Sequence, residues 1–203
     1  MSRSLEDALR RSGPRNEADE LAPGFIDRAE RGRLVDVAYS TVDSPLGPLV
    51  VAATAKGLVC VHYGDDSDVL EELATKISPR VLHVPGRLDT VRRELDEYFD
   101  GKRKRFAFKI DWRLMGPFQQ KVLKATKAIP FGKVATYRDV ATKAGAPRGS
   151  RAAGNALGAN PMPIVVPCHR VIRTGGGLGG YTGGLHRKEF LLQLEGAEMS
   201  RRR

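Results

Sequence analysis

Cys168 stands in the segment of this sequence where several reactive residue types are adjacent. It ends the apolar, strand-like run 164–167 and precedes His169 and Arg170. A thiolate is a nucleophile, and it needs a neighbour that lowers its pKa or accepts its proton, which His169 can do. Isolated cysteines are usually buried structural residues, and Cys60, between two valines, fits that description. Because polar neighbours are costly to bury, the sequence predicts that Cys168 is a reactive thiol.

The net charge of +10 is unevenly distributed along the chain. Residues 1–36 hold 7 Lys/Arg against 8 Asp/Glu, residues 37–100 hold 6 against 11, and residues 101–203 hold 21 against 5. The C-terminal half therefore carries a balance of +16, which is typical of a face that binds nucleic acid. The alternatives are a basic surface without such a partner, or pairing with the acidic N-terminal half.

A helix-turn-helix is predicted in this basic half. An amphipathic helix over 117–129 is followed by a short helix over 137–144, a Gly-Ala-Pro turn, and a second helix over 150–160 that Ser150 can cap. A helix that reads the major groove needs long polar side chains. The second helix is instead expected to expose small residues, which suit close approach to the minor groove. These are Ala152, Ala153, Gly154, Ala156 and Gly158.

The preceding part of the chain predicts a small α/β domain. β-branched residues alternate on both sides of two turns over 35–64, which indicates an antiparallel meander. Residues 67–78 and 87–99 have apolar residues at helical spacing. The basic segment 102–111 is predicted as a strand at a sheet edge, where its charges discourage pairing or contact DNA. Residues 1–34 are predicted as a loosely attached polar extension with two short helices.

Composition narrows the class of protein further. No apolar run approaches the ~20 residues of a membrane span, and the N-terminus has no apolar core of a signal peptide, so we expect no membrane association. With only two cysteines, neither a disulfide framework nor a multi-cysteine zinc site is expected. We therefore predict no metal and a reducing location: the cytoplasm, or the nucleus in a eukaryote.

The residues around Cys168 resemble the active-site signature of the O6-alkylguanine-DNA alkyltransferases. Other segments similar to that family occur in the family's order over about residues 37–196. They read VDSPLGPLVVAA, LDEYFDGKRKRFAF, FQQKVLKATKAIPFGKVATY, GNALGANPMPIVVPCHRVI and GGYTGGLHRKEFLLQLEG. The resemblance implies a protein that flips an O6-alkylated guanine out of double-stranded DNA. It then transfers the alkyl group irreversibly to its own cysteine, once per molecule and without a cofactor.

The resemblance also assigns catalytic roles. Cys168 would accept the alkyl group, and His169 would connect it, through a water, to Glu195, so that a thiolate–imidazolium pair is stabilised. Asn160 would tie the helix-turn-helix to the active-site segment; on its own it also fits a helix C-cap. Tyr137 would meet the flipped nucleotide and donate a proton to guanine as the alkyl group leaves, whereas without the resemblance it is an aromatic residue at the core edge.

Further residues would bind the DNA and the base. Arg151 would enter the base stack in place of the extruded nucleotide; otherwise it is a solvated surface residue. Ala152 and Gly154 would allow the close approach of the second helix. Three residues would surround the base: Val171, Tyr181 and Thr182. Thr182 stands where the family has a smaller residue, so its methyl group is expected to disfavour bulky substituents. Gly116-Pro117 and Leu123 also depart from the pattern, outside the reactive residues.

The resemblance places these residues in an α/β (α+β) fold of two domains. The N-terminal domain, 35–112, would hold an RNase H-like antiparallel sheet, and the C-terminal domain, 113–203, the helix-turn-helix and the alkyl acceptor. We expect a monomer and leave open whether copies bind DNA cooperatively. Three alternatives are a lesion-binding protein without alkyl transfer, a transcription regulator, and a Cys-His hydrolase. The presence of a thiol argues against the lesion-binding protein, which needs no nucleophile. The second helix lacks the base-reading side chains of a transcription regulator, and no oxyanion-hole signature of a hydrolase accompanies Cys168.

Overall fold

The computed structural model describes residues 24–64 and 67–197. The chain divides into two units, residues 1–35 and residues 36–203. None of the described helices combines the length and the apolar character needed to cross a membrane.

The described part of the first unit, residues 24–35, contains the helix α2 (Phe25–Arg31). It confirms the second short helix predicted for the N-terminal extension, although it is shorter than the expected range 25–34. The other predicted helix, over 5–11, and the C-terminal arginines 201–203 lie outside the described residues.

Four strands form the sheet of the second unit: β1 (Val37–Val42), β2 (Leu49–Thr54), β3 (Gly57–Tyr63) and β4 (Val81–His83). Their order is β3-β2-β1-β4. The antiparallel pairs β1–β2 and β2–β3 confirm the predicted meander. The sheet also has a parallel edge, because β4 pairs with β1 in the same direction, and this strand was not expected.

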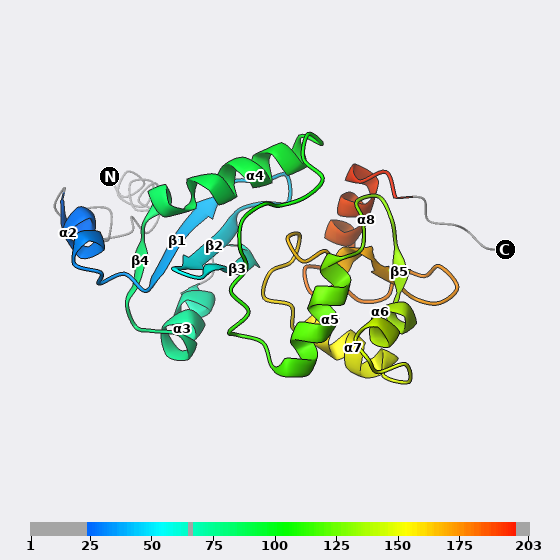
Figure 1. Ribbon diagram of the computed structural model, residues 1–203. Coiled ribbons are helices and arrows are strands. Elements are labelled where there is room, and N and C mark those ends of the chain that lie inside the picture. Colours follow the sequence, from blue (N-terminus) through cyan, green and yellow to red (C-terminus); the bar gives the residue numbers. More distant parts are fainter. Residues whose placement is uncertain (1–23, 65–66, 198–203) are drawn as a thin grey trace, which may run out of the picture. The chain divides into compact units, whose positions relative to one another are not determined.

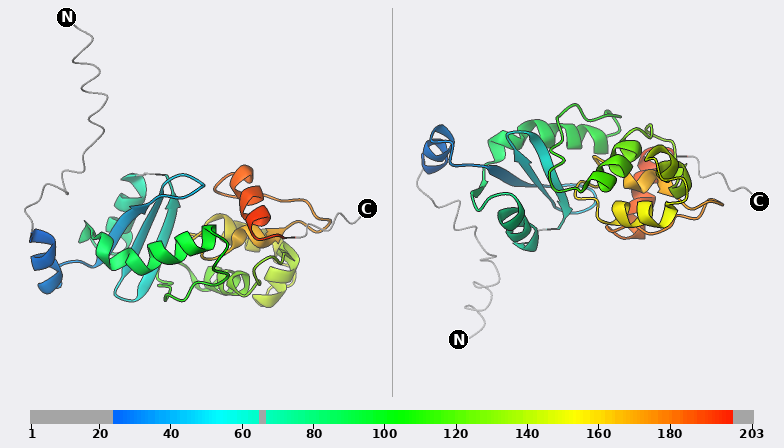
Figure 2. Two further views of the ribbon diagram at one scale, coloured as in Figure 1. Left: turned by 90° about the horizontal axis from the view of Figure 1, so that it is seen from above. Right: turned by 60° about the horizontal axis from the view of Figure 1, so that its bottom comes forward.

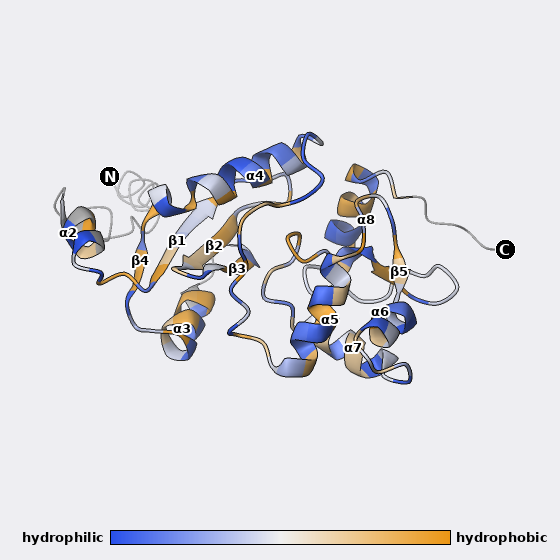
Figure 3. Ribbon diagram, in the orientation of Figure 1, coloured by the Kyte–Doolittle hydropathy of each residue, from blue (hydrophilic) through white to orange (hydrophobic). Residues whose placement is uncertain are grey.

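The sheet lies between α3 (Ser67–Lys76) and α4 (Asp89–Phe99), as the views in Figures 1 and 2 agree. A one-turn 3₁₀ helix, η2 (Pro85–Leu88), leads into α4. Alternate residues of β2 enter the two cores, so this central strand is apolar along its length (Figure 3). The α3 side holds Val50, Ala52, Cys60, Val69 and Leu73, and the α4 side holds Leu49, Val51, Val91, Leu95 and Tyr98.

The chain after residue 112 is mainly helical and carries a two-stranded parallel sheet. Its elements before the last loop are α5 (Pro117–Lys127), β5 (Ala135–Thr136), α6 (Tyr137–Lys143) and α7 (Ser150–Gly158). They are followed by η3 (Cys168–Arg170), β6 (Val171–Ile172) and α8 (Leu185–Leu194). The N-terminal sheet domain and the helical C-terminal domain agree with the expected fold class. The predicted domain boundary after residue 112 falls in the connection between α4 and α5.

The helix-turn-helix consists of α6, a turn through Gly145, and α7. The first helix begins at a capping box, in which the Thr136 hydroxyl accepts from the Asp139 amide at 3.1 Å and the Asp139 carboxylate accepts from the Thr136 amide at 2.8 Å. Gly145 has φ +83°, a conformation that favours glycine and that lets the chain reverse. The predicted cap of the second helix is wrong: Gly149 is the N-cap, and Ser150 is already helical without a capping bond.

The strand expected over 102–111 is absent from the structure, where these residues form an irregular segment with one bridge, from Ile110 to Leu58. Residues 102–111 instead make contacts with α4. The buried Glu94 carboxylate accepts a hydrogen bond from the Ala107 amide at 2.8 Å, and Arg103 contacts Glu94 at 3.3 Å. Bonds to side chains of α4 thus take the place of hydrogen bonds to a neighbouring strand. The alternating pattern of the sequence is the same in both cases, so it did not distinguish them.

Candidate active site

Cys168 lies at the start of a single 3₁₀ turn, η3, that follows an irregular segment. The strand predicted for residues 164–167 is wrong, and the strand β6 begins only after the turn. Prolines 161, 163 and 167 interrupt this segment, and they cannot donate to a sheet ladder. Ile164 has φ +72°, which a β-branched residue rarely adopts. Its side chain is buried, so the apolar run serves the core instead of a sheet.

Cys168 is buried, 8% exposed as a residue, and lines two cavities. One, of about 470 Å³, extends toward β3 and α3 and includes Cys60 and Asn160 in its wall. The other, of about 720 Å³, extends along α6 and α7 and includes Tyr137 and Arg151. Among the described residues, no group of three or more His, Cys, Asp or Glu side chains is placed to hold a metal ion.

Asn160 connects the end of α7 to the Cys168 segment, as the resemblance implies. Its Nδ2 donates to the Val166 carbonyl at 2.9 Å and to Cys168 Sγ at 3.2 Å, while its Oδ1 accepts from the Met162 amide at 3.1 Å. The C-cap of α7 is Ala159 rather than Asn160. One amide side chain therefore fixes both the backbone of the segment and the position of the sulfur.

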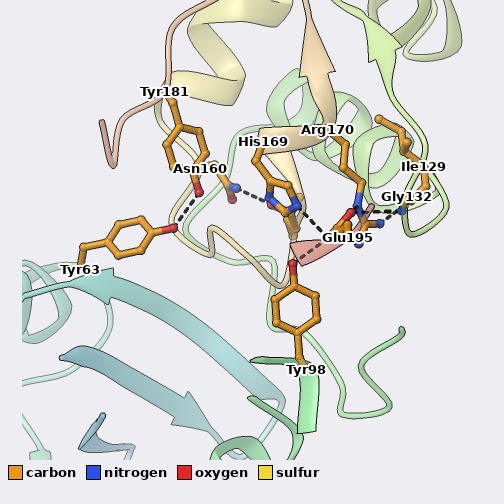
Figure 4. Close-up of polar contacts among 10 residues, drawn as sticks. Tyr63, Tyr98, Ile129, Gly132, Asn160, His169, Arg170, Tyr181 and Glu195 are labelled. Atoms are coloured by element: carbon orange, nitrogen blue, oxygen red, sulfur yellow. Dashed lines mark hydrogen bonds and ion pairs between the residues drawn. The ribbon is translucent and has the colours of Figure 1, made fainter. Parts of the chain in front are cut away.

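Glu195, the C-cap residue of α8, is the centre of a buried polar cluster (Figure 4). His169 Nε2 lies 2.9 Å from Glu195 Oε1, so the predicted pair is brought together by direct contact. Arg170 donates to both carboxylate oxygens at 2.8 Å and to the Ile129 carbonyl at 2.6 Å. Tyr98 of α4 donates to Oε1 at 2.6 Å. The carboxylate thus joins the N-terminal domain to the reactive turn.

Burial raises the pKa of Glu195, but the hydrogen bonds from His169 and Arg170 outweigh it and lower the pKa to about 2. Burial lowers the pKa of His169, against the opposing effect of Glu195, so the imidazole is neutral at neutral pH. Because Nε2 must donate to an ionised carboxylate, Nδ1 is the nitrogen that accepts a proton. Nδ1 is buried and has no hydrogen-bond partner within the described part of the chain. The ring is therefore oriented to act as a base through Nδ1.

Burial raises the pKa of the Cys168 thiol, while the hydrogen bond from Asn160 and the charge of Lys188 act in the opposite direction. This direction differs from the expected low-pKa thiolate, because the C-terminal positive charges are mostly on the surface and the sulfur is in the interior. Arg170 and Lys188 are buried exceptions, and only Lys188 affects the thiol: its Nζ donates to the Val171 carbonyl at 2.6 Å and to the Leu178 carbonyl at 2.5 Å. Burial therefore favours the neutral form of both the thiol and the imidazole.

The cavity beside α7 gathers most of the predicted base-binding residues. Tyr137, Arg151, Gly154, Tyr181 and Thr182 line it together with Cys168. Arg151 and Ala152 are exposed at the start of α7, and Gly154 faces the Tyr137 ring, where an added Cβ would lie 3.7 Å from it. Burial raises the pKa of Tyr137, so its hydroxyl stays protonated.

Three of the predicted positions are more buried than expected. Ala153 is fully buried and Ala156 is 9% exposed, so they belong to the packing of the helix pair and not to the solvent face of α7. Val171 is also fully buried, paired with Ala135 in the β5–β6 sheet, and it does not line either cavity at Cys168. The small exposed residues of α7 are thus Ala152 and Gly158, with Gly154 half-buried.

The loop between β6 and α8 brings Tyr181 and Thr182 to the site. The Thr182 hydroxyl donates to the Gly158 carbonyl at 2.6 Å, which ties the loop to the end of α7. The Tyr181 hydroxyl lies 2.7 Å from that of Tyr63 in β3 (Figure 4). Both loop residues line both cavities with Cys168, so they form the wall between them.

Sequence reasoning missed four residues that contact the site. Arg170 and Lys188 are charged and buried, and Tyr63 and Tyr98 come from the N-terminal domain. Arg170 had a local signal, since it adjoins His169, but its partner is 25 residues away. The others are brought to the site by tertiary contacts that no local pattern of the sequence indicates.

The fold and the site define an α/β protein of two domains that places a buried thiol beside a helix-turn-helix. Residues 37–112 match the model of the 6-O-methylguanine DNA methyltransferase ribonuclease-like domain, and residues 117–197 match the model of the DNA-binding domain of the same enzymes. The chain belongs to the 6-O-methylguanine DNA methyltransferase family.

Relatives cover most of the chain. A methylated-DNA–protein-cysteine methyltransferase of Mycobacterium bovis is 40% identical over 159 residues, 78% of this chain and 92% of the relative. An inducible enzyme of that name from Bacillus subtilis is 41% identical over 150 residues, 71% of this chain and 82% of the relative. The crystal structure of Mycobacterium tuberculosis OGT in complex with DNA has a TM-score of 0.69 and 38% identity, covering 78% of this chain and 92% of that one.

Proposed function

We propose that this protein repairs O6-alkylated guanine in double-stranded DNA by moving the alkyl group onto Cys168, once per molecule. The observation that carries the proposal is the position of Cys168. Cys168 lines a cavity together with Tyr137 and Arg151 of the helix-turn-helix, and the Nδ1 of the adjacent His169 has no hydrogen-bond partner among the residues that the structure describes. The names of the relatives and the DNA complex of one of them support the same function.

In the reaction, the sulfur of Cys168 forms a bond to the alkyl carbon as the bond from that carbon to guanine O6 breaks. The thiol proton passes through a water to His169 Nδ1, and Glu195 stabilises the imidazolium that results. The electron pair of the broken bond goes to guanine, which takes up a proton that Tyr137 can donate. The products are a thioether and an unmodified guanine. Because a thioether has no easy route back to a thiol, the protein is consumed.

Neutral resting groups fit this scheme. A buried thiolate would be costly without a partner, whereas proton transfer to His169 during attack forms the thiolate together with a compensating imidazolium. Asn160 Nδ2, 3.2 Å from Sγ, and the buried ammonium of Lys188 stabilise the negative charge that develops on sulfur. These groups therefore favour ionisation of the thiol during the attack on the alkyl carbon.

The exposed residues of α7 fit the extrusion of a base. An alkylated O6 lies inside the duplex, so the nucleotide must leave the stack, at a cost of a few kcal/mol. Arg151 is exposed on the rim of the cavity and can fill the space that the base leaves. Ala152 and Gly158, without long side chains, allow the helix to approach a groove closely. Tyr181 and Thr182 then cover the base beside Cys168.

The second candidate is a protein that binds the lesion without transferring the alkyl group. It would need no nucleophile, and it would not need His169, Asn160 and Lys188 arranged around a thiol. The presence of Cys168 among these groups favours transfer. For the location we propose a reducing compartment, the cytoplasm, because the reaction requires a free thiol.

Intact mass spectrometry tests the proposal. The protein is incubated with excess duplex carrying one O6-methylguanine, and its mass should rise by one methyl group, which peptide mapping places on Cys168. Cys168→Ser should gain nothing, while Cys60→Ser, which alters the buried thiol of β3, should react as the wild type does. Binding of the lesion without any gain of mass would support the second candidate, and continued turnover after alkylation would exclude a single-use mechanism.

A further inference from the structure

The loop between β6 and α8 has a sequence that does not hold a conformation by itself. It contains seven glycines from residue 175 to residue 184, and glycine leaves the unfolded chain with the most conformational freedom. Yet the loop carries Tyr181 and Thr182 in the wall of both cavities at Cys168. Its position over the base must therefore come from side chains outside the loop.

Tyr63, at the end of β3, supplies a contact from the N-terminal sheet. Its hydroxyl lies 2.7 Å from the Tyr181 hydroxyl, and the two rings meet edge to face, with centroids 6.3 Å apart (Figure 4). Burial raises the pKa of both phenols, so both stay protonated and one donates to the other. Tyr181 is thus held by a residue 118 positions earlier in the chain.

The Tyr63 ring also fixes the end of the loop. A Cβ added at Gly183 would lie 2.5 Å from this ring, so the loop backbone packs directly on it. The Tyr63 ring also contacts Arg187, whose guanidinium lies 4.6 Å from the ring centroid. Arg187 donates to the Gly183 carbonyl at 2.8 Å and to the Leu46 carbonyl, in the β1–β2 turn, at 3.4 Å. Sheet, loop and α8 therefore meet at one tyrosine.

We propose that Tyr63 is a positioning residue for alkyl transfer, and that through its hydroxyl and ring it holds Tyr181 over the base beside Cys168. The N-terminal sheet domain then takes part in the reaction without touching the substrate. This inference rests on the proposed function, since it assigns a purpose to the position of Tyr181.

Tyr63→Phe is the sharpest test, because it removes the hydroxyl and keeps the ring against Gly183 and Arg187. Single-turnover alkyl transfer is measured over a range of duplex concentrations, so that affinity and the rate constant at saturation are separated. The rate constant should fall by about three- to tenfold, the effect of one lost hydrogen bond, while DNA affinity is unchanged. Reaction with free O6-benzylguanine should slow equally, since the loop covers the base with or without a duplex.

Two further variants show whether the effect passes through Tyr181. If it does, adding Tyr63→Phe to Tyr181→Phe should cause no further loss, because the hydroxyl pair is already broken. Tyr39→Phe is the matched control: Tyr39 lies on β1 of the same sheet, against the His83 ring, and its variant should react at the wild-type rate. Melting temperatures of all variants check that the sheet is intact.

The outcomes separate the two proposals. If the wild type transfers the alkyl group and Tyr63→Phe transfers it at the same rate, the role of Tyr63 is overturned and the proposed function is unaffected. The role of Tyr63 would also be overturned if Tyr63→Phe lowered the rate constant by the same factor in the wild type and in the Tyr181→Phe variant. If the wild-type protein transfers no alkyl group, the proposed function itself fails.

Discussion

Cys168 and His169 are adjacent in sequence, but the protonation of His169 depends on Glu195, a residue 26 positions further along the chain. The buried carboxylate of Glu195 fixes which imidazole nitrogen carries the proton, and Arg170 keeps that carboxylate ionised. A catalytic group in this site is therefore defined by its buried partners as much as by its own chemical type.

The first prediction concerns the titration of Cys168. Because burial raises the pKa of this thiol, a small alkylating probe should react with an apparent pKa above the ordinary thiol value of about 8.5. Asn160→Ala removes the hydrogen bond to sulfur and should raise the apparent pKa further and slow DNA repair. The measurement is the pH dependence of probe incorporation at Cys168, read by mass spectrometry. A wild-type pKa well below 8.5 would show instead that the thiolate exists before substrate binds.

The second prediction concerns Glu195→Gln, which keeps the size of the side chain and removes its charge. Alkyl transfer should slow by about tenfold or more, because the imidazolium of His169 loses its stabilising carboxylate. The buried guanidinium of Arg170 also loses its partner, at a cost of about 3–5 kcal/mol in the free energy of unfolding. Glu189→Gln, on the exposed face of the same helix, is the matched control and should change neither quantity.

The pH dependence of stability provides an independent check on Glu195. Its pKa is lowered from 4.5 to about 2 in the folded protein, so the folded state binds fewer protons there than the unfolded state. The stabilisation is present above pH 4.5 and is lost as the pH falls towards 2. Denaturant unfolding at several pH values should show this loss in the wild type and a smaller one in Glu195→Gln. Equal acid sensitivity of both would contradict the assignment.

At the scale of elements, α7 separates DNA contact from chemistry, because Arg151 is exposed at its first turn while Cys168 is buried beyond its end. We predict that Arg151→Ala slows repair of duplex DNA much more than reaction with free O6-benzylguanine, since a free base needs no flipping. Arg148→Ala removes the same charge from the exposed turn before α7 and should weaken duplex binding without changing the rate at saturation. Equal losses on both substrates would exclude a flipping role for Arg151.

The sequence predicted elements well where a local pattern determines them. The meander, the two helices that cover it, and the helix-turn-helix follow from alternation, helical spacing and glycine or proline turns. Prediction failed where distant contacts decide. Residues 102–111 look like a strand, but Glu94 binds their backbone. Residues 164–167 look like a strand as well, but prolines and the bonds of Asn160 shape them.

The candidate site divides in the same way. Cys168 and His169 were predicted from their residue types and adjacency, and Asn160, Tyr137 and Arg151 from the resemblance of their segments to a known family. Tyr63 and Tyr98 were not found, since their partners are 118 and 97 residues away and no spacing along the chain connects them. Ala153 and Ala156 were placed on the wrong face because small residues fit a helix interface as well as a smooth surface.

At the scale of the whole molecule, the positive charge is concentrated in residues 101–203. Binding to unmodified duplex should therefore be largely independent of sequence and fall steeply with salt; proteins that contact 6–10 phosphates lose about 10³–10⁵ in affinity between 50 and 200 mM. Fluorescence anisotropy with two unrelated duplexes measures both properties. Arg148→Ala should lower the salt slope by about one. Arg92, exposed on α4 beside Asp89, provides the control, and Arg92→Ala should leave the salt slope unchanged. If Arg92→Ala lowered the slope as much as Arg148→Ala does, the DNA would also contact the N-terminal domain.

The backbone conformation of Ile164 bears on whether the reactive segment could work in another protein. A β-branched residue at φ +72° costs about 1–3 kcal/mol, so the segment before Cys168 does not choose its shape unaided. The core around the Ile164 side chain and the amide of Asn160 impose it. A peptide holding Pro-Cys-His-Arg, or the same four residues grafted onto another scaffold, would relax to an ordinary loop with an ordinary thiol. The reactive unit is therefore the entire folded surrounding and cannot be transplanted as a motif.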